Sequence, residues 1–301
     1  LFFSIGSLFA QLQSAYFQQE VNYKIDVRLD DTLHFLHGHE TIEYKNNSHE
    51  TINYIYFHLW PNAYKNYHTA LAKQLLENKN SSLFTANEND LGYIDSLAFK
   101  SNGKLLEWEN YLDYEDVIIL YLNEPLFPGE SVTISTPFRV KIPSGKISRL
   151  GHIGQSYQIT QWYPKPAVFD RSGWHPMPYL NQGEFYSEYG SFDVKITLPK
   201  NYVVGATGDL VNGEEELAWL NKKVEETKAI TAFNTENPWI FPKSDTVYKT
   251  LHYHQEKVHD FAWFADKRYH VLKGEVTLPH TKRKVTTWAM FTDIEPELWM
   301  N

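Results

Sequence analysis

The feature that most constrains this chain is a recurring two-residue alternation of apolar and polar side chains. Residues 21–29, Val-Asn-Tyr-Lys-Ile-Asp-Val-Arg-Leu, show it clearly. This period is typical of a half-buried β-strand, because successive side chains point to opposite faces of a sheet. Similar short segments recur with turn signals between them and little helical periodicity. The sequence therefore predicts an all-β fold, arranged as a saddle-shaped antiparallel β-sandwich or as open sheets.

The expected strands are separated by residues that favour turns. Asp30-Asp31 follows the first strand, Pro61 ends the third, and Pro128-Gly129 separates two later ones. Leu71, Leu75 and Leu76 are spaced for one face of a short helix within residues 67–78. We expect strands at 21–29, 32–44, 52–60, 117–122, 131–140, 193–198, 202–207, 246–253, 261–265, 276–278 and 284–291.

Composition and charge narrow the classes of function. The 301 residues can bury a substantial core, and 16% of them are aromatic, as in β-rich proteins and binding clefts. The net charge of -9 and the lack of clustered Lys and Arg argue against a nucleic-acid partner. The absence of cysteine excludes disulfides, thiolate metal sites and cysteine nucleophiles.

Both ends of the sequence suggest a piece of a longer protein. Residues 1–11 form an apolar run with a small-residue step at Ala10-Gln11, which resembles the end of a secretory signal. We expect residues 1–16 to be a signal remnant and the protein to be exported to the periplasm, the outer surface or the medium. The run is too short for a transmembrane segment. Residues 294–301 resemble the first turn of a helix that continues beyond Asn301.

A search for metal ligands among the 13 histidines finds only incomplete patterns. His39-Glu40 and His49-Glu50 begin a His-Glu-x-x-His motif but lack the second histidine. His252 and His254 share one face of an expected strand, without a third ligand at a recognisable spacing. We therefore expect no metal site within this chain.

Residues 151–190 combine glutamines, aromatics, prolines and carboxylates at high density. Binding residues concentrate on loops held by a rigid scaffold, so we expect this stretch to be a recognition surface. Glu184 and Glu188 are weak evidence for a glycosidase pair, because two surface carboxylates are common in any protein.

This stretch carries a resemblance to a known family. Tyr157-Gln-Ile-Thr-Gln-Trp-Tyr-Pro-Lys-Pro-Ala-Val-Phe-Asp170, Gly173-Trp-His175, Gln182-Gly-Glu-Phe-Tyr186, Glu188-Tyr-Gly190 and Tyr202-Val-Val-Gly-Ala-Thr-Gly208 are similar to the N-terminal domain of zinc aminopeptidases of the aminopeptidase N type. The secreted bacterial branch is the most similar. Residues 259–266 and 21–60 resemble other strands of that domain.

The resemblance implies an N-terminal β domain at residues 17–270 and the start of a thermolysin-like catalytic domain at 271–301. In the family, the catalytic domain carries Gly-x-Met-Glu-Asn and His-Glu-x-x-His, which do not occur here. The zinc ligands are therefore expected outside this chain, which would be inactive alone. The implied partners are its own catalytic domain and a peptide with a free amino terminus.

The resemblance also implies a residue that holds the substrate's amino group. In the family this is a Gln or Glu nine residues before the Pro of a Phe-Pro motif, which corresponds to Gln155 when counted from Pro164. The sequence departs from the usual motif, so that Gln158 and then Gln161 are alternatives. An amide carbonyl is a suitable acceptor for an ammonium group.

Two other interpretations remain open. The chain could be a non-catalytic β-sandwich that binds a peptide or a carbohydrate by stacking on Trp162, Tyr163, Phe169 and Trp174. It could also be a structural domain that binds no ligand.

Overall fold

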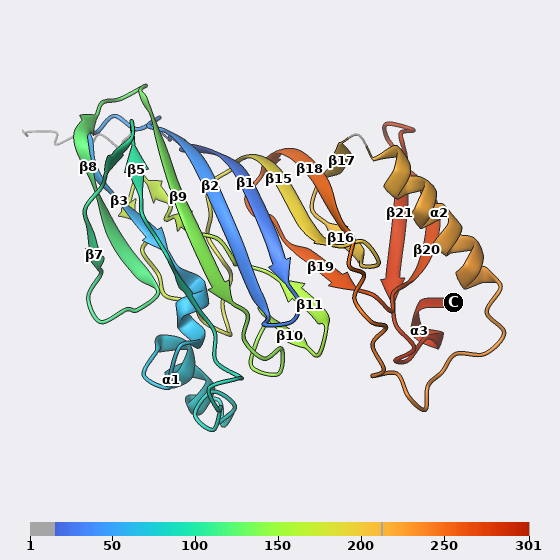
Figure 1. Ribbon diagram of the computed structural model, residues 1–301. Helices are drawn as coiled ribbons and strands as arrows, with labels where there is room; N and C mark the ends of the chain where they lie inside the picture. The colour runs from blue at the N-terminus through green and yellow to red at the C-terminus, as the bar shows by residue number, and fades with distance from the viewer. Residues whose placement is uncertain (1–15, 212, 301) are drawn as a thin grey trace, which may run out of the picture.

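The computed structural model describes residues 16–211 and 213–300 (Figure 1). The expected signal remnant lies outside the described residues, except for Tyr16. Strands account for 43% of the chain and helices for 11%, and the sheets do not close into a barrel, so the expected all-β fold is confirmed. No helix in the described part has the length and apolar character needed to cross a membrane.

The largest sheet has nine strands and forms the centre of the molecule (Figure 1). β1 pairs with β2 over its whole length, and β2 pairs in the same way with β9. In the order of the sheet the strands are β17 (Asp209–Val211), β18 (Tyr248–Val258), β15 (Gly190–Pro199), β1 (Glu20–Asp30), β2 (Phe35–Lys45), β9 (Ser131–Lys141), β5 (Lys100–Ser101) and β6 (Lys104–Leu105), with β4 (Tyr93–Asp95) also paired to β9.

Two four-stranded sheets complete the main body. One contains β10 (Gly151–Ile153), β11 (Ser156–Ile159), β19 (Trp263–Asp266) and β16 (Val203–Ala206), in that order. The other contains β12 (Lys165–Pro166), β3 (Ile52–His58), β8 (Val117–Leu126) and β7 (Trp108–Asn110). A small hairpin pairs β13 (Phe169–Asp170) with β14 (Gly173–Trp174). The stretch expected to be one recognition loop is therefore divided into short strands.

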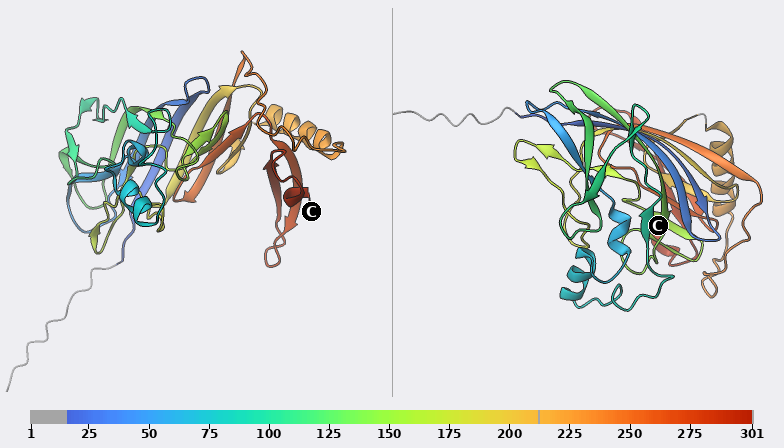
Figure 2. Two further views of the ribbon diagram at one scale, coloured as in Figure 1. Left: turned by 90° about the horizontal axis from the view of Figure 1, so that it is seen from below. Right: turned by 60° about the vertical axis from the view of Figure 1, so that its left-hand side comes forward.

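The described residues form few helices. The 3-10 helix η1 (Trp60–Tyr64) follows β3 directly, and α1 (Ala70–Glu77) lies within the expected helical segment. The side chain of Thr69 caps α1 by accepting a hydrogen bond from the backbone N–H of Ala72. At the other end of the molecule lie α2 (Glu214–Lys228), the hairpin of β20 (His270–Thr277) and β21 (Lys284–Phe291), and α3 (Glu297–Met300) (Figure 2).

The alternation seen in the sequence places one face of each long strand in the core. In β1, Val21, Tyr23, Ile25, Val27 and Leu29 are all buried, and the residues between them are more exposed. Most of the buried apolar side chains of the main body form one continuous cluster. A second, smaller cluster lies beneath α2 and consists of Val203, Leu220, Val224 and Val271.

One pairing differs from the expected antiparallel pattern, because β1 and β15 run parallel. The residues that separate β9 from β15 cross between sheets and return the chain to the open edge of β1 in the same direction. Such a crossover is what a parallel pair requires.

Candidate functional site

The three candidate glutamines lie on or beside β11. Gln155 is in the turn that joins β10 to β11, Gln158 is within β11, and Gln161 follows its end. β11 is held between β10 and β19 by antiparallel pairing, in which Gln158 lies opposite Gly151 and Phe264. The three side chains therefore depend on one strand but have different surroundings.

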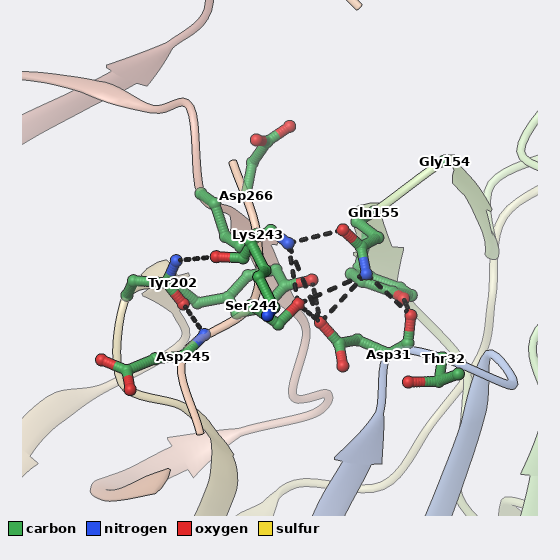
Figure 3. Close-up of polar contacts among 12 residues, drawn as sticks. Asp31, Thr32, Gly154, Gln155, Tyr202, Lys243, Ser244, Asp245 and Asp266 are labelled. Carbon is green, nitrogen blue, oxygen red and sulfur yellow. Dashed lines mark hydrogen bonds and ion pairs between the residues drawn. The ribbon is translucent and has the colours of Figure 1, made fainter. Parts of the chain in front are cut away.

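Gln155 belongs to a polar network that joins five separate segments (Figure 3). Its Nε2 donates to the backbone oxygen of Asp31 at 3.1 Å and lies 3.4 Å from the Ser244 Oγ. Its Oε1 accepts a hydrogen bond from the Lys267 Nζ at 2.5 Å. The Tyr202 hydroxyl donates to the Asp31 carboxylate at 2.8 Å in the same network.

This network already uses both ends of the Gln155 amide. The Lys267 side chain is fully buried, and burial lowers the pKa of its ammonium although Asp31 and Asp266 raise it. The Gln155 carbonyl therefore already accepts a hydrogen bond from an ammonium group, but this group is the Lys267 side chain and not part of a ligand. The geometry favours a structural role for Gln155.

Gln158 lines a cavity of about 360 Å³. Its Nε2 donates to the Ser148 backbone oxygen at 3.3 Å. Across the cavity lie aromatic side chains from the C-terminal hairpin and α3, including Phe291 and Trp299. Of the three glutamines, only Gln158 lines this cavity.

Gln161 has the least satisfied side chain of the three. Its Nε2 donates to the Asp260 Oδ2 at 3.2 Å, but its Oε1 is buried and has no hydrogen-bond partner within residues 16–211 and 213–300. The same is true of the Thr160 Oγ1 and the Trp263 Nε1. The backbone of Gln161 has a φ of 49°, a left-handed conformation that costs about 1–3 kcal/mol in a non-glycine residue. Strained backbones and unpaired buried polar groups are both concentrated at functional sites.

Asp260 connects Gln161 to a buried ion pair. The Asp260 Oδ1 lies 2.9 Å from the Lys165 Nζ and accepts a hydrogen bond from the Tyr163 hydroxyl at 2.8 Å. Burial raises the pKa of Asp260, but the Lys165 ammonium and the hydrogen bonds together lower it more, so that the pKa lies below its usual value. Asp260 is therefore a fixed carboxylate next to the Gln161 amide.

A stacked histidine pair lies beside Gln155. The rings of His34 and His152 are 3.7 Å apart, and the His34 Nδ1 is 2.8 Å from the Tyr157 hydroxyl. Burial, and then the nearby His152, lowers the pKa of His34 to about 4. Protonation of His34 is therefore opposed in the folded state.

We expect this pair to make the protein sensitive to acid. Because the folded state lowers the His34 pKa from 6.5 to about 4, its stabilising effect is present above pH 6.5 and is lost as the pH falls through about 4. His34→Phe keeps a stacking ring but cannot be protonated. We expect the free energy of unfolding to fall between pH 7 and pH 4 in both proteins, and to fall by about 1–3 kcal/mol less in the variant than in the parent protein. Urea unfolding at the two pH values measures this difference. Equal losses would show that another group causes the acid sensitivity.

The aromatic residues proposed for stacking on a ligand are mostly part of the core. Trp162, Tyr163 and Phe169 are at most 6% exposed, so their assignment to a stacking surface is wrong. They lie inside because the chain between β11 and β15 packs against the large sheet. Trp174 is partly exposed and contacts Phe169 with ring centroids 4.8 Å apart.

The carboxylates and histidines considered in the sequence lie in different surroundings. Glu184 is exposed, whereas Glu188 is buried and accepts a hydrogen bond from the Phe169 N–H at 3.1 Å. His252 is held by Asp193 at 2.9 Å. Among the described residues, no group of three or more His, Asp or Glu side chains could hold a metal ion.

The partners of the glutamines lie far from them in the sequence. Lys267 is 112 positions from Gln155, and Asp260 is 99 positions from Gln161. No spacing rule connects residues that far apart. Gln161 itself had one usable signal, because it directly precedes two consecutive aromatic residues, which are buried in the structure.

Comparison with known proteins gives similarities in structure only. No family model and no curated protein matches the chain. An M1 zinc metallopeptidase mutant from Deinococcus radiodurans matches 91% of this chain and 47% of its own, with 14% identity and a TM-score of 0.49. The same mutant bound to a Tyr-Ser-Ala substrate gives 13% identity, 91% and 47% coverage and a TM-score of 0.48. A two-domain M1 zinc metallopeptidase mutant bound to L-arginine gives 12% identity, 91% and 48% coverage and a TM-score of 0.47. The chain thus spans about half the length of the M1 zinc metallopeptidase structures to which it is similar.

Proposed function

We propose that this chain is the N-terminal, substrate-amine-binding part of a zinc-dependent aminopeptidase that removes N-terminal residues from peptides. The β domain would occupy residues 17–270, and residues 271–301 would begin the catalytic domain. The motifs between Tyr157 and Gly208 support this assignment by their resemblance to the aminopeptidase N family. The zinc ligands would lie beyond Asn301, and zinc would activate the attacking water.

The observation that carries the proposal is the unpartnered Gln161 carbonyl. Leaving a buried acceptor without a donor costs about 1–3 kcal/mol, and a substrate ammonium would supply the missing hydrogen bond. The Asp260 carboxylate, 3.2 Å from the Gln161 Nε2, orients the amide so that its oxygen is left without a donor among the described residues. Among the three candidates we therefore place the substrate amine at Gln161, with Gln158 as the alternative.

We expect Gln161→Met to lower kcat/KM of the full-length enzyme about tenfold to a hundredfold on substrates with a free amino terminus. Methionine has a similar volume but cannot accept this hydrogen bond strongly. Substrates with a blocked amino terminus should lose nothing further. Gln161→Glu should also lower activity, because it removes the Nε2 donor and places a second carboxylate beside the Asp260 Oδ2, which is 3.2 Å from that nitrogen.

Gln155→Met and Gln158→Met are matched controls for this test. Gln155→Met should lower stability, since it leaves the buried Lys267 ammonium without one partner, but should spare kcat/KM of the folded enzyme. If Gln158→Met has the large effect and Gln161→Met has none, the amine lies at the cavity. If the enzyme does not distinguish free from blocked amino termini, the chain is not an amine-binding domain.

We also propose that the protein is exported. The support is the signal-like composition of residues 1–11. Fractionation of cells that produce the full-length protein should place it outside the cytoplasm, and N-terminal sequencing should show cleavage near Ala10. A cytoplasmic protein that retains this segment would contradict the proposal.

A further inference from the structure

A group of aromatic rings covers the outward face of the sheet formed by β3 and β8. Ile55 and Phe57 of β3 and Leu120 of β8 point into the core, so the alternation turns Tyr54 and Tyr56 outward. Tyr121 of β8 lies directly opposite Tyr54 in the register of the two strands. We call Tyr54, Tyr56, Tyr111, Tyr121 and Trp174 the aromatic surface.

The rings of the aromatic surface are in continuous contact. The Tyr54 ring centroid lies 5.5 Å from Tyr56, 6.5 Å from Tyr121 and 6.4 Å from Trp174. Tyr56 in turn lies 4.8 Å from Tyr111 and 5.7 Å from Trp174. The positions are therefore fixed by one another as well as by the sheet.

This surface is accessible to a ligand. Tyr54 is 37% exposed and Tyr121 is 39% exposed, and the other three rings are partly exposed. Contiguous exposed aromatic side chains on a soluble protein commonly mark a binding site. Tyrosine adds a hydroxyl to each apolar ring face, so that a ligand can both stack and form hydrogen bonds.

The charge on this face limits the kind of ligand. The Tyr121 hydroxyl donates to the Glu109 Oε1 at 2.6 Å, and Glu109 is exposed on β7 next to Ile119. None of the ion pairs or cation–π contacts of the described residues brings a Lys or Arg to these rings. A phosphate, a nucleic acid or an anionic membrane would need such cations. The acceptors at this face suit a neutral ligand that donates hydrogen bonds.

From this geometry we propose that the aromatic surface binds a neutral carbohydrate chain. A sugar ring presents a flat face of C–H groups that packs against an aromatic ring, and hydroxyl groups at its edge that donate to carboxylates and phenols. Tyr54 and Tyr121 lie opposite each other on neighbouring strands, with their ring planes inclined at 64°, so a chain of sugar rings that follows this bend would contact both. Glu109 would accept hydrogen bonds from the sugar hydroxyls. This site is separate from the Gln161 site and does not depend on peptidase activity.

Native gel electrophoresis of the purified protein in gels that contain a soluble neutral polysaccharide tests this proposal. Glucomannan, mixed-linkage β-glucan and amylose are used as separate probes. We expect at least one of them to retard the protein relative to a gel without polysaccharide. The double variant Tyr54→Ala/Tyr121→Ala should weaken binding tenfold or more.

Two controls separate ligand contact from folding. Tyr67→Ala removes another exposed tyrosine, which lies outside the aromatic surface and is 53% exposed, and should bind like the parent protein. Tyr54→Phe/Tyr121→Phe keeps the rings and should retain most of the binding. No retardation by any of the three probes would overturn the proposal, as would retardation that the double alanine variant leaves unchanged. A change of oligomeric state in that variant would instead identify a protein interface.

Discussion

Asp260→Ala should lower the free energy of unfolding by about 3–5 kcal/mol, because it leaves a buried ammonium without its counter-ion. The Lys165 side chain is only 2% exposed and would keep two long contacts, to the Ser187 Oγ at 3.3 Å and to the His259 backbone oxygen at 3.4 Å. These neutral acceptors replace little of the lost charge interaction. Urea unfolding followed by circular dichroism at pH 7 measures the loss.

The opposite variant, Lys165→Met, should cost less than Asp260→Ala. The Asp260 carboxylate would still accept hydrogen bonds from the Tyr163 hydroxyl and from the Phe261 N–H, each at 2.8 Å. The charged group that remains would therefore be better satisfied than Lys165 in the first variant.

Asp95→Ala provides a control on a pair that is exposed. The Arg139 Nη2 lies 2.6 Å from the Asp95 Oδ2, but the two side chains are 40% and 36% exposed. Removal of this ion pair should therefore lower the free energy of unfolding by no more than about 1 kcal/mol. If Asp260→Ala costs as little as Asp95→Ala, the Lys165–Asp260 pair is not closed to water.

The long strands could be predicted from the sequence because burial of one face requires an apolar residue at every second position. β1, β2, β3, β9 and β15 all lie within a few residues of the expected ranges. The short strands from β10 to β14 could not be found in this way. Two to four residues are too few to show a period, and the positions of these strands depend on the sheet against which they pack.

The helix α2 was missed although the sequence holds a weak signal for it. Leu217, Leu220 and Val224 are spaced for one helical face, but most of the surrounding residues are charged. Only Leu220, Val224 and Thr227 are buried, so the apolar face is narrow. Gly213 at its start provides no side-chain cap, which removes the usual marker of a helix N-terminus.

The candidate site was predicted only in part. The resemblance gave Gln155 as the first candidate, counted back from Pro164, with Gln158 and then Gln161 as alternatives, but no local pattern in the sequence tests that order. The preference for one glutamine over another depends on their contacts with Lys267 and Asp260. These two residues lie near β11 because β19 pairs with it. Such partners are a property of the tertiary fold and leave no local pattern.

Glu188 is expected to make the protein less stable as the pH rises. The side chain is buried, and burial, opposed by the hydrogen bond from the Phe169 N–H and assisted by the charge of Asp170, raises its pKa from 4.5 to about 8. The folded state therefore favours the protonated form. The stabilisation is complete below pH 4.5 and is lost as the pH rises through about 8.

Comparison with Glu188→Gln isolates this effect. Glutamine stays neutral and can still accept the hydrogen bond from the Phe169 N–H. Burial raises the pKa of Asp116 to about 7, so that ionisation of Asp116 also lowers the stability of both proteins as the pH rises. The difference in unfolding free energy between parent and variant should therefore change by about 3–5 kcal/mol between pH 5 and pH 9, at about 1.4 kcal/mol for each pH unit in which only the folded carboxyl is protonated. Parallel pH profiles would show that Glu188 is ionised in the folded protein, and hence that water reaches the space between Phe169 and the large sheet.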